Sequence, residues 1–467
     1  MSDTETEKFS LKHALAYSSG LFSDVLSYQF FTFLIFTFYY SIIGLPSDWI
    51  TIAFIIWSIW NALNDPMWGI ISDRTNTKWG RRRPYIIISI IPLCAIVVLL
   101  WTPVTTSSVS AFVYFFIIIV LFDTIYTLYS INQTSLFPEM FQSLEIRSKV
   151  NNVRQIFSVI ALIFAFILPS FFIRNYTDKQ YAPNYIITGI VIAIVMFVGA
   201  LIFIKWGIKE KKMFAIEKDS SPSFFKSIGI TLTNRSFIFY ALTALANWYV
   251  FGMLPTIVPL FGRFALNTSD SFLQSILLGL AFISAIIFIF FWRFITLKVG
   301  LRIGFMLSML AFIVVLIPFL WISDFTSGII AFFFVGIGLS GSLFFRDPLV
   351  SAIADEDELK TGVRREGSFY GVNALIIRLS TIFIFITINS VFTSTGWAVF
   401  APETATPTEI LIYANGLRML MFVFPAIALA FGIVMMLLFP LTKKKMEQIR
   451  EKVNLLHEEK KAKLARQ

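Results

Sequence analysis

Charged residues are scarce in this sequence of 467 residues: only 14% are Asp, Glu, Lys or Arg, whereas 57% are hydrophobic. A soluble domain has about a quarter charged and about half apolar residues, and the mean hydropathy here is +0.78. Phenylalanine alone contributes 53 residues, which suits surfaces that face lipid acyl chains. The composition therefore excludes an ordinary soluble domain and favours a membrane protein.

Cysteine and histidine are almost absent as well, with Cys94, His13 and His457 as their only instances. One cysteine excludes an internal disulfide framework and a cysteine-based metal site, and two histidines are too few for a histidine metal site. The sequence contains no G-x-x-x-x-G-K-[ST] phosphate loop and no nucleophile–base motif. These absences argue against ATP drive and against an enzyme, so we expect no cofactor and no metal other than a coupling ion.

One glycine-rich segment, residues 336–341 (GIGLSG), formally matches the dinucleotide fingerprint G-x-G-x-x-G. The fingerprint binds nucleotides only between a strand and a helix, and this segment lies inside a long apolar run. We therefore interpret its small residues as a place where two helices pack closely.

Long apolar runs are what the sequence has instead of charge. A helix that spans a membrane needs about 20 mostly apolar residues. We expect an all-α integral membrane protein of the major facilitator fold, with twelve transmembrane helices in two pseudo-symmetric six-helix bundles. The predicted runs are 14–40, 48–72, 84–102, 109–137, 148–174, 184–206, 236–262, 270–296, 302–322, 327–353, 366–393 and 409–439.

The basic residues are unevenly distributed among the connections between these runs. Of the 38 Lys and Arg residues, only Arg174, Lys179 and Arg263 follow an odd-numbered run. The positive-inside rule then predicts a multi-pass protein of the cell membrane with both termini in the cytoplasm. The net charge of +10 is thus interpreted as orientation, not as nucleic-acid binding. Because the first run contains Asp24 and exceeds a secretory h-region in length, we expect a retained helix.

The predicted organisation has four parts. Residues 1–206 form an N-terminal six-helix bundle, 207–235 a cytoplasmic linker, 236–440 a C-terminal six-helix bundle, and 441–467 a basic cytoplasmic tail. Carriers with two such halves rock around a site near the membrane midplane. In the tail, Met446, Ile449, Val453 and Leu456 have helical spacing, which predicts a helix on the membrane surface.

Several ionisable side chains interrupt the apolar runs, where each costs at least about 2.5 kcal/mol. They could be buried ion pairs that hold helices together. Their recurrence at mid-depth in both halves instead favours a wet central cavity. These residues are Asp24, Asp65, Asp123, Arg154, Arg346, Asp347, Arg378 and Arg418.

Asp65 is the central acid of this set. Asn61 precedes it by one helical turn, and Asp123 and Thr127 share a face of another run. A carboxylate, an amide oxygen and a hydroxyl from Asp65, Asn61 and Thr127 are hard ligands for a cation, and an isolated buried carboxylate also suits a proton. The alternative is that Asp65 is a polar residue at a helix end, tolerated because of Pro66.

Residues 61–84 (NALNDPMWGIISDRTNTKWGRRRP) carry a resemblance to a known family. The pattern N-D-P-x-x-G-x-[IV]-S-D-R-T-x-[ST]-x-W-G-[RK]-x-[RK]-P is similar to the helix 2–3 signature of the glycoside–pentoside–hexuronide:cation symporters. These are melibiose-carrier-like members of the major facilitator superfamily. The resemblance implies an alternating-access carrier that couples a sugar or glycoside to Na⁺, Li⁺ or H⁺. The similarity continues weakly along the chain.

The resemblance also implies roles for individual residues. Asp24 and Arg154 match positions that contact the sugar, and Asp65 and Thr127 match positions of the cation site. A cytoplasmic gate is implied as well, for which the basic cluster after the second run is either a topology anchor or a latch. The gate residues are Asp73, Arg74, Arg81, Arg147, Asp355, Glu358 and Arg364.

The sequence departs from melibiose-type carriers at four positions of the implied cation and sugar sites. Asn61 stands for a second acid of helix 2, and Arg378 for a lysine of helix 11. Ser130 and Thr134 stand for the sugar-binding acid and tryptophan of helix 4. The lost acid weakens a Na⁺ site, and arginine keeps a fixed positive charge. H⁺ coupling is therefore at least as well favoured as Na⁺, and galactoside specificity is in doubt.

The function we predict is cation-coupled symport of a sugar, glycoside or similar small polar solute, with Asp24, Arg154, Ser130, Thr134 and Arg378 at the substrate site. The expected partners are this small molecule, a carbohydrate by resemblance, and the lipid bilayer. We expect a monomer and no nucleic acid. The alternatives are a carrier of an organic anion or a lysolipid-like amphiphile, a lipid scramblase, a membrane enzyme, or a sensor on a carrier scaffold.

Overall fold

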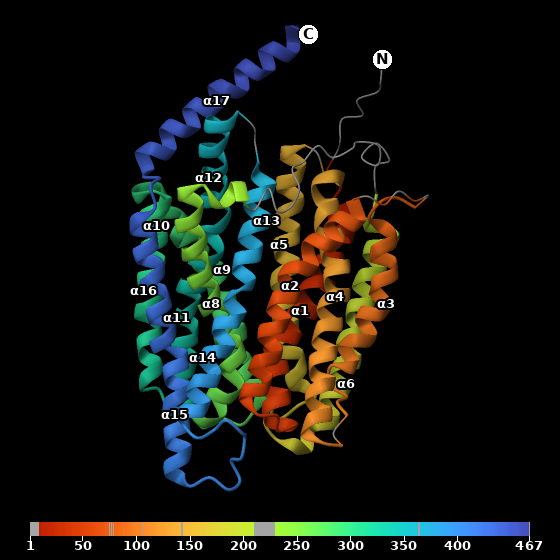
Figure 1. Ribbon diagram of the computed structural model, residues 1–467, viewed down its shortest axis with the longest axis vertical. Helices are drawn as coiled ribbons and strands as arrows, with labels where there is room; N and C mark the ends of the chain where they lie inside the picture. The colour runs from red at the N-terminus through yellow and green to blue at the C-terminus, as the bar shows by residue number, and fades with distance from the viewer. Residues whose placement is uncertain are drawn as a thin grey trace.

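The computed structural model describes residues 9–73, 75, 77, 79–104, 106–141, 143–209, 229–362 and 365–466 (Figure 1). Within these ranges the regular structure is helical, apart from an isolated bridge between Thr77 and Gly80. The first half contains α1 (Leu11–Thr37, continued by a π-turn over Phe38–Ile42), α2 (Ser47–Asp73), α3 (Arg83–Leu99), α4 (Ser108–Met140), α5 (Leu144–Ile167) and α6 (Ala182–Ile202).

The second half of the chain repeats this helical pattern with shorter pieces. It contains α8 (Arg235–Phe264), α9 (Ser271–Val299), α10 (Leu301–Leu316), α11 (Phe325–Phe344), α12 (Arg346–Thr361), α13 (Glu366–Arg378), α14 (Ser380–Ser394), α15 (Pro407–Met421), α16 (Val423–Leu438) and α17 (Lys443–Arg466).

The helices confirm the predicted spans. Ten helical segments of the described ranges are long and apolar enough to cross a membrane. The more polar α2 and the shorter α3, of 17 residues, lie at the second and third predicted runs. The described chain is thus an all-helical membrane protein with elements at all twelve predicted positions.

Three runs that the sequence predicts as single helices are broken in the structure. Two breaks share one feature: α11 ends at Phe344 and α15 at Met421, each four residues before a proline (Pro348 and Pro425). Proline has no N–H to bond to that carbonyl, so each break lacks one helical hydrogen bond. The same loss does not end α2 at Pro66 or α8 at Pro255 and Pro259. The third break separates α13 from α14 at Leu379, whose N–H donates to Ile376 O at 3.1 Å. This hydrogen bond spans three residues instead of the four of an α-helix, so it tightens the turn in the middle of the predicted run.

Small residues let the helices pack closely within each half. At Gly336 of α11, a Cβ atom would lie 2.8 Å from the carbonyl oxygen of Ala281 on α9. At Gly199 of α6, a Cβ atom would lie 3.2 Å from the carbonyl oxygen of Ser19 on α1. The first of these contacts confirms that the GIGLSG segment is a helix-packing surface.

The first described residues of α1 and the helix α17 lie at one end of the bundle, which we call the termini end, and the two halves are joined at the opposite, far end (Figure 1). There the Ser47 N–H of α2 donates to Ala398 O at 2.8 Å, and its hydroxyl donates to Asn389 of α14 at 2.6 Å. The rings of Phe54 and Phe385 stack at 3.7 Å. Contacts across this end therefore close it.

A second set of contacts joins the halves at the same end through α8, α9 and the connection after α5. The N–H of Ser271 donates to Arg174 O at 2.9 Å, and Arg263 donates to Thr177 O at 3.0 Å. A separate contact at the far end caps a helix. Asp324 lies outside the spans and caps α11 by accepting from the Ser327 N–H at 2.9 Å. This hydrogen bond from a backbone N–H holds the pKa of the Asp324 carboxyl below its usual range.

The tail forms the predicted helix, α17, which extends obliquely from the termini end (Figure 1). Ile449 and Val453 of its apolar stripe are buried, and α17 packs against α12. Lys445 lies 4.0 Å from Glu356 of α12. The stripe therefore contacts protein, and a position on the membrane surface stays a prediction.

Candidate functional site

Two parallel helices, α2 and α4, carry a ladder of polar contacts at mid-length. Asn61 Nδ2 donates to Asp123 Oδ1 at 2.5 Å, and one turn further on Thr127 Oγ1 donates to Asp65 Oδ1 at 3.0 Å. Because residues four apart share a helix face, the spacing of both pairs in the sequence aligns the two rungs. The structure therefore brings Asp65 and Thr127 together, and their role in a cation site stays a prediction.

Asp123 is the residue that sequence reasoning left out of this site. It is 0% exposed and also accepts from Asn64 Nδ2, which lies 3.1 Å from its Oδ2 and 3.1 Å from its backbone oxygen. Asn61 therefore contacts Asp123 and not Asp65, with which it was predicted to act. The signal that could have found Asp123 is its position one turn before Thr127.

Arg378 forms an ion pair with Asp65, and the Arg378 Nη2 to Asp65 Oδ2 distance is 2.5 Å. The sequence placed these two residues in different sites, whereas the structure joins them across the two halves. Arg378 is the last residue of α13, where the negative end of the helix dipole stabilises a cation. The guanidinium of Arg378, at the break between α13 and α14, thus contacts Asp65.

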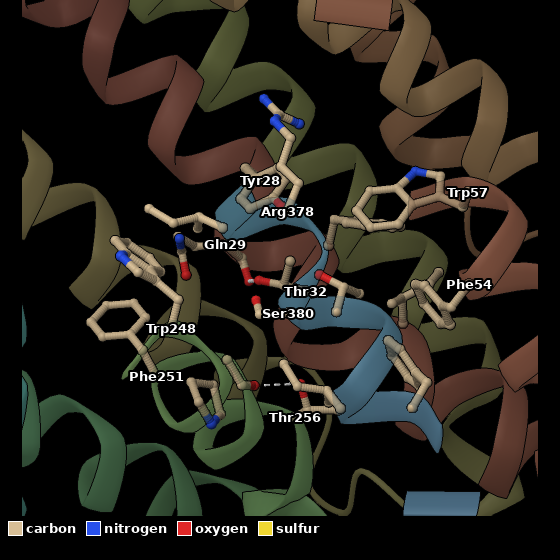
Figure 2. A pocket seen from close by; sticks show the side chains of 18 residues that line it. Tyr28, Gln29, Thr32, Phe54, Trp57, Trp248, Phe251, Thr256, Arg378 and Ser380 are labelled. Atoms are coloured by element: carbon tan, nitrogen blue, oxygen red, sulfur yellow. Dashed lines mark hydrogen bonds between the residues drawn. The ribbon is translucent and has the colours of Figure 1, made fainter. Parts of the chain in front are cut away.

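A cavity of about 150 Å³ lies beside this pair, between α1, α2, α8, α13 and α14 (Figure 2). Its volume is roughly ten times what one water needs, so it can admit a small solute. Figure 2 shows Trp57 and Trp248 on opposite sides, with the hydroxyls of Thr32 and Ser380 between them. The lining also includes Tyr28, Gln29, Phe31, Phe54, Phe251, Thr256, Arg378 and Thr381.

Of the predicted substrate residues, Arg378 lines this cavity, whereas the other four lie outside its lining. Asp24 is 7% exposed, and its Oδ1 has no hydrogen-bond partner. Its carboxyl group lies near Arg154 and near the hydroxyls of Ser130 and Tyr126, which are 3.5 Å apart. These residues therefore form a second polar group, with Tyr126 stacked at 5.1 Å on the cavity residue Tyr28.

Arg154 and Thr134 of this second group differ in what they contact. The Arg154 guanidinium lies 4.0 Å from the ring centre of Phe137, and its Nε donates to no acceptor. Thr134 donates to its neighbour Gln133 at 3.4 Å. Sequence reasoning missed the cavity residues of α8, Trp248 and Thr256, because nothing distinguishes them from other residues of an apolar run.

The predicted gate residues that the structure describes lie at the termini end, and the contacts given for Arg81 and Arg147 are within the first half. Arg81 and Arg82 both bind Glu139 of α4, at 2.7 and 2.8 Å. Arg147 donates to Phe141 O at 2.9 Å. Arg74, Arg364 and the side chain of Asp73 lie outside the described residues.

In the second half, the two predicted gate acids lie on α12. Glu358 is buried, 1% exposed, and Asp355 borders a groove between α12 and α17. Sequence reasoning missed the ion pair of Asp357 with Arg365, at 2.7 Å. The role of all these residues as a gate stays a prediction.

Comparison with known families identifies the kind of protein to which this site belongs. The profile of the family described as MFS/sugar transport protein matches residues 16–443. The chain belongs to this family. With its symporter relatives, this assigns the chain to the glycoside–pentoside–hexuronide:cation symporters of the major facilitator superfamily, as the motif over 61–84 predicts. It is a multi-pass membrane transporter.

Relatives within this symporter family are distant but cover most of the chain. An uncharacterized symporter, sll1374, of Synechocystis sp. is 22% identical over 96% of this chain and 97% of that protein. The isoprimeverose transporter of Lactiplantibacillus pentosus is 23% identical over 75% of this chain and 74% of that protein. The putative sulfoquinovose importer of Salmonella typhimurium is 25% identical over 91% and 88%.

Solved structures agree with the fold of this symporter family. The nucleoside transporter NupG superposes with a TM-score of 0.66 at 14% identity, over 92% of this chain and 100% of that chain. A bacterial homologue of the lysosomal transporter Spinster superposes with a TM-score of 0.65 at 15% identity, over 91% and 97%. At such identity the likeness establishes the major facilitator fold alone.

Proposed function

We propose that the protein is a secondary active transporter that couples the symport of a sugar, a glycoside or a similar small polar solute to a cation, H⁺ or Na⁺, by alternating access. The observation that carries this proposal is the 2.5 Å ion pair between Asp65 of α2 and Arg378 of α13. This pair joins the two halves of the transporter directly beside the central cavity.

The ion pair gives a physical basis for coupling. A cation that binds Asp65 competes with Arg378, whose guanidinium keeps its charge and cannot release it as a lysine could. Binding of the cation therefore weakens the bond between the halves at the cavity. A ligand shifts a conformational equilibrium only when it binds one state more tightly, and this competition supplies such a difference.

The closed far end fits one state of an alternating-access cycle. If the basic connections lie in the cytoplasm, the far end faces the outside, and the contacts of Ser47 with Ala398 and Asn389 form the outer seal. Release of solute to the outside then requires that these contacts break. The two termini are accordingly proposed to be cytoplasmic, in the cell membrane.

The cavity lining supports a sugar as the solute. The aromatic faces of Trp57, Trp248 and Tyr28 can cover the apolar face of a pyranose ring, while Gln29 and the Thr32 hydroxyl can bond its hydroxyl groups. The names of two relatives, an isoprimeverose transporter and a sulfoquinovose importer, also support a carbohydrate.

A second candidate is an organic anion, since the guanidinium of Arg378 lines the cavity. An anion would have to displace the carboxylate of Asp65 from Arg378, at the cost of leaving that carboxylate buried without its partner. Sugars need no such exchange, so the neutral solute is the better-supported proposal.

The proposal is tested by uptake into proteoliposomes that contain the purified chain. Sugars, glycosides and organic anions are each supplied under a Na⁺ gradient, an H⁺ gradient or no gradient. We expect accumulation of a carbohydrate above its outside concentration under one of the two gradients only. Accumulation of organic anions alone would favour the second candidate. Scrambling of labelled lipid with no uptake of any solute would refute transport.

A further inference from the structure

A groove at the termini end lies apart from the central cavity. Its volume is about 810 Å³, within the range of roughly 300–1,000 Å³ that is usual for ligand sites. It is lined by the first turns of α1, by α5 and by the segment that follows α6. Because α1 begins at Leu11 and α6 ends at Ile202, the groove lies where these two spans leave the hydrocarbon core of the membrane.

One wall of the groove is a π-turn, Phe203–Gly207, which packs against α1. His13 Nε2 donates to Gly207 O at 2.9 Å. A Cβ atom at Gly207 would lie 2.7 Å from Ala16 O, so glycine is what lets the two backbones approach this closely. Segments of π-helix are rare and are frequently found at functional sites. The turn leaves Trp206 56% exposed at the end of a span, a position at which tryptophan contacts the membrane–water interface.

The groove carries positive charge. Lys12, Lys205 and Lys209 line it, and all three are exposed. Among the residues that the structure describes, no carboxylate lines the groove, and no ion pair between described residues involves any of these lysines. The N-terminus of α1, capped by Ser10, adds the positive end of a helix dipole. The groove therefore attracts an anion.

The rest of the lining is apolar and continues along the spans. Leu15, Phe157 and Ile202 line the groove beside the lysines. Phe164 lies seven residues after Phe157 on α5, and Val198 lies four residues before Ile202 on α6, so each shares a helix face with the lining residue. Both are exposed, and they extend the apolar surface toward the far end. A free phosphate ion would contact the lysines alone, whereas a phospholipid would also cover this surface with an acyl chain.

We propose that this groove is a binding site for an anionic phospholipid of the leaflet at the termini end. The headgroup phosphate lies among Lys12, Lys205 and Lys209, and an acyl chain lies along the apolar lining toward Phe164 and Val198. Basic pockets between transmembrane helices bind anionic headgroups, and the cytoplasmic leaflet, which the termini end is proposed to face, carries the anionic lipids. The site goes beyond the proposed function because it depends neither on the solute nor on the coupling ion.

The test measures lipid binding to the purified full-length protein in detergent by native mass spectrometry. The protein is titrated with dioleoyl phosphatidylglycerol or, for comparison, with dioleoyl phosphatidylcholine, which has the same acyl chains and no net charge. Each lysine beside an anionic headgroup contributes about 5-fold in affinity. We therefore expect the triple variant Lys12→Gln, Lys205→Gln, Lys209→Gln to bind the first phosphatidylglycerol roughly 100-fold more weakly than the wild type. Its affinity for phosphatidylcholine should stay within about 5-fold of the wild type.

A matched control separates the groove from the net charge of the protein. The triple variant Lys298→Gln, Lys444→Gln, Lys452→Gln removes the same number of charges at exposed lysines of the second half. We expect it to bind phosphatidylglycerol as the wild type does. Equal weakening in the two triple variants, or a wild type that binds the two lipids with equal affinity, overturns the proposal.

Soluble anions separate a lipid site from a site for free phosphate. Inorganic phosphate or glycerol phosphate is added in large excess to the wild type with phosphatidylglycerol bound. We expect neither to displace the lipid, because neither covers the apolar part of the groove. Displacement of the lipid by either anion overturns the proposal in favour of a site for a free phosphate group.

Discussion

Replacement of Arg378 by glutamine separates the two roles that this residue could have. If Arg378 is a substrate ligand only, the variant loses affinity for the solute and keeps its affinity for the coupling cation. If Arg378 competes with the cation for Asp65, as the 2.5 Å ion pair implies, the variant binds the cation more tightly. Glutamine removes the charge and keeps a polar N–H group, on a side chain that is shorter than that of arginine and has fewer donors.

The size of this effect follows from the position of the pair. Two unit charges 4 Å apart attract or repel by about 4 kcal/mol at an effective dielectric constant of about 20. Both side chains are 24% exposed, so hydration reduces this energy. We take about half, roughly 2 kcal/mol, which corresponds to a gain of about 30-fold in cation affinity.

Cation affinity is measured by calorimetric titration of NaCl into the purified protein at constant pH, for wild type, Arg378→Gln and Arg378→Lys. We expect Arg378→Lys to keep a cation affinity close to that of the wild type because it keeps the charge. Uphill transport by Arg378→Gln should fall, since the cation no longer displaces an internal partner. An Arg378→Gln variant that binds the cation as weakly as the wild type, or more weakly, would refute the competition.

Three further predictions follow from individual contacts. Thr127→Val removes the hydrogen bond to Asp65 at 3.0 Å, and a hydrogen bond to a charged group contributes about 1.5–3 kcal/mol. The affinity for the cation in the NaCl titration should therefore fall about 10-fold in Thr127→Val, whereas Thr127→Ser should keep the affinity of the wild type. Gly336→Ala places a Cβ 2.8 Å from a carbonyl oxygen of α9, so thermal unfolding of the purified protein should show that its stability falls by about 1–3 kcal/mol. The control Gly371→Ala, whose Cβ has nothing within 4 Å, should keep the stability of the wild type. Equal losses of stability in the two variants would contradict the close packing. Trp248→Ala should weaken solute binding about 10-fold, by the energy of one aromatic contact, and Trp248→Phe should restore part of it; unchanged binding by the alanine variant would place the solute elsewhere.

The positions of the helices could be predicted from the sequence because lipid imposes a simple rule. A span needs about 20 apolar residues, and every predicted run is helical. Two of the three helix breaks follow from Pro348 and Pro425, whose effect on the carbonyl four residues earlier is local. The rule alone does not predict which prolines break a helix, because α2 continues past Pro66 and α8 continues past Pro255 and Pro259.

The candidate site was predicted only in part, because its main contacts join distant segments. The contact of Asp65 with Thr127 was expected from matching positions on two runs. The pairing of Asp65 with Arg378 requires that the halves meet at α2 and α13, and no local pattern encodes this. Asp123 was seen in the sequence, but its burial and its contact with Asn61 depend on how α2 and α4 pack.

These contacts also change the argument about the coupling ion. Counting acids along α2 alone suggests that Asn61 removes a charge from a Na⁺ site. The packing of α4 against α2 brings Asp123 within 2.5 Å of Asn61, so the neighbouring helix supplies a charge where the sequence shows a loss.

The central claim, that Asp65 couples the movement of a solute to a cation, is tested most directly by one comparison in proteoliposomes. Wild type and Asp65→Asn are assayed for gradient-driven accumulation and for exchange of labelled solute across the same membrane at equilibrium. The account predicts that Asp65→Asn exchanges solute and accumulates none. Accumulation by Asp65→Asn to the level of the wild type would contradict it.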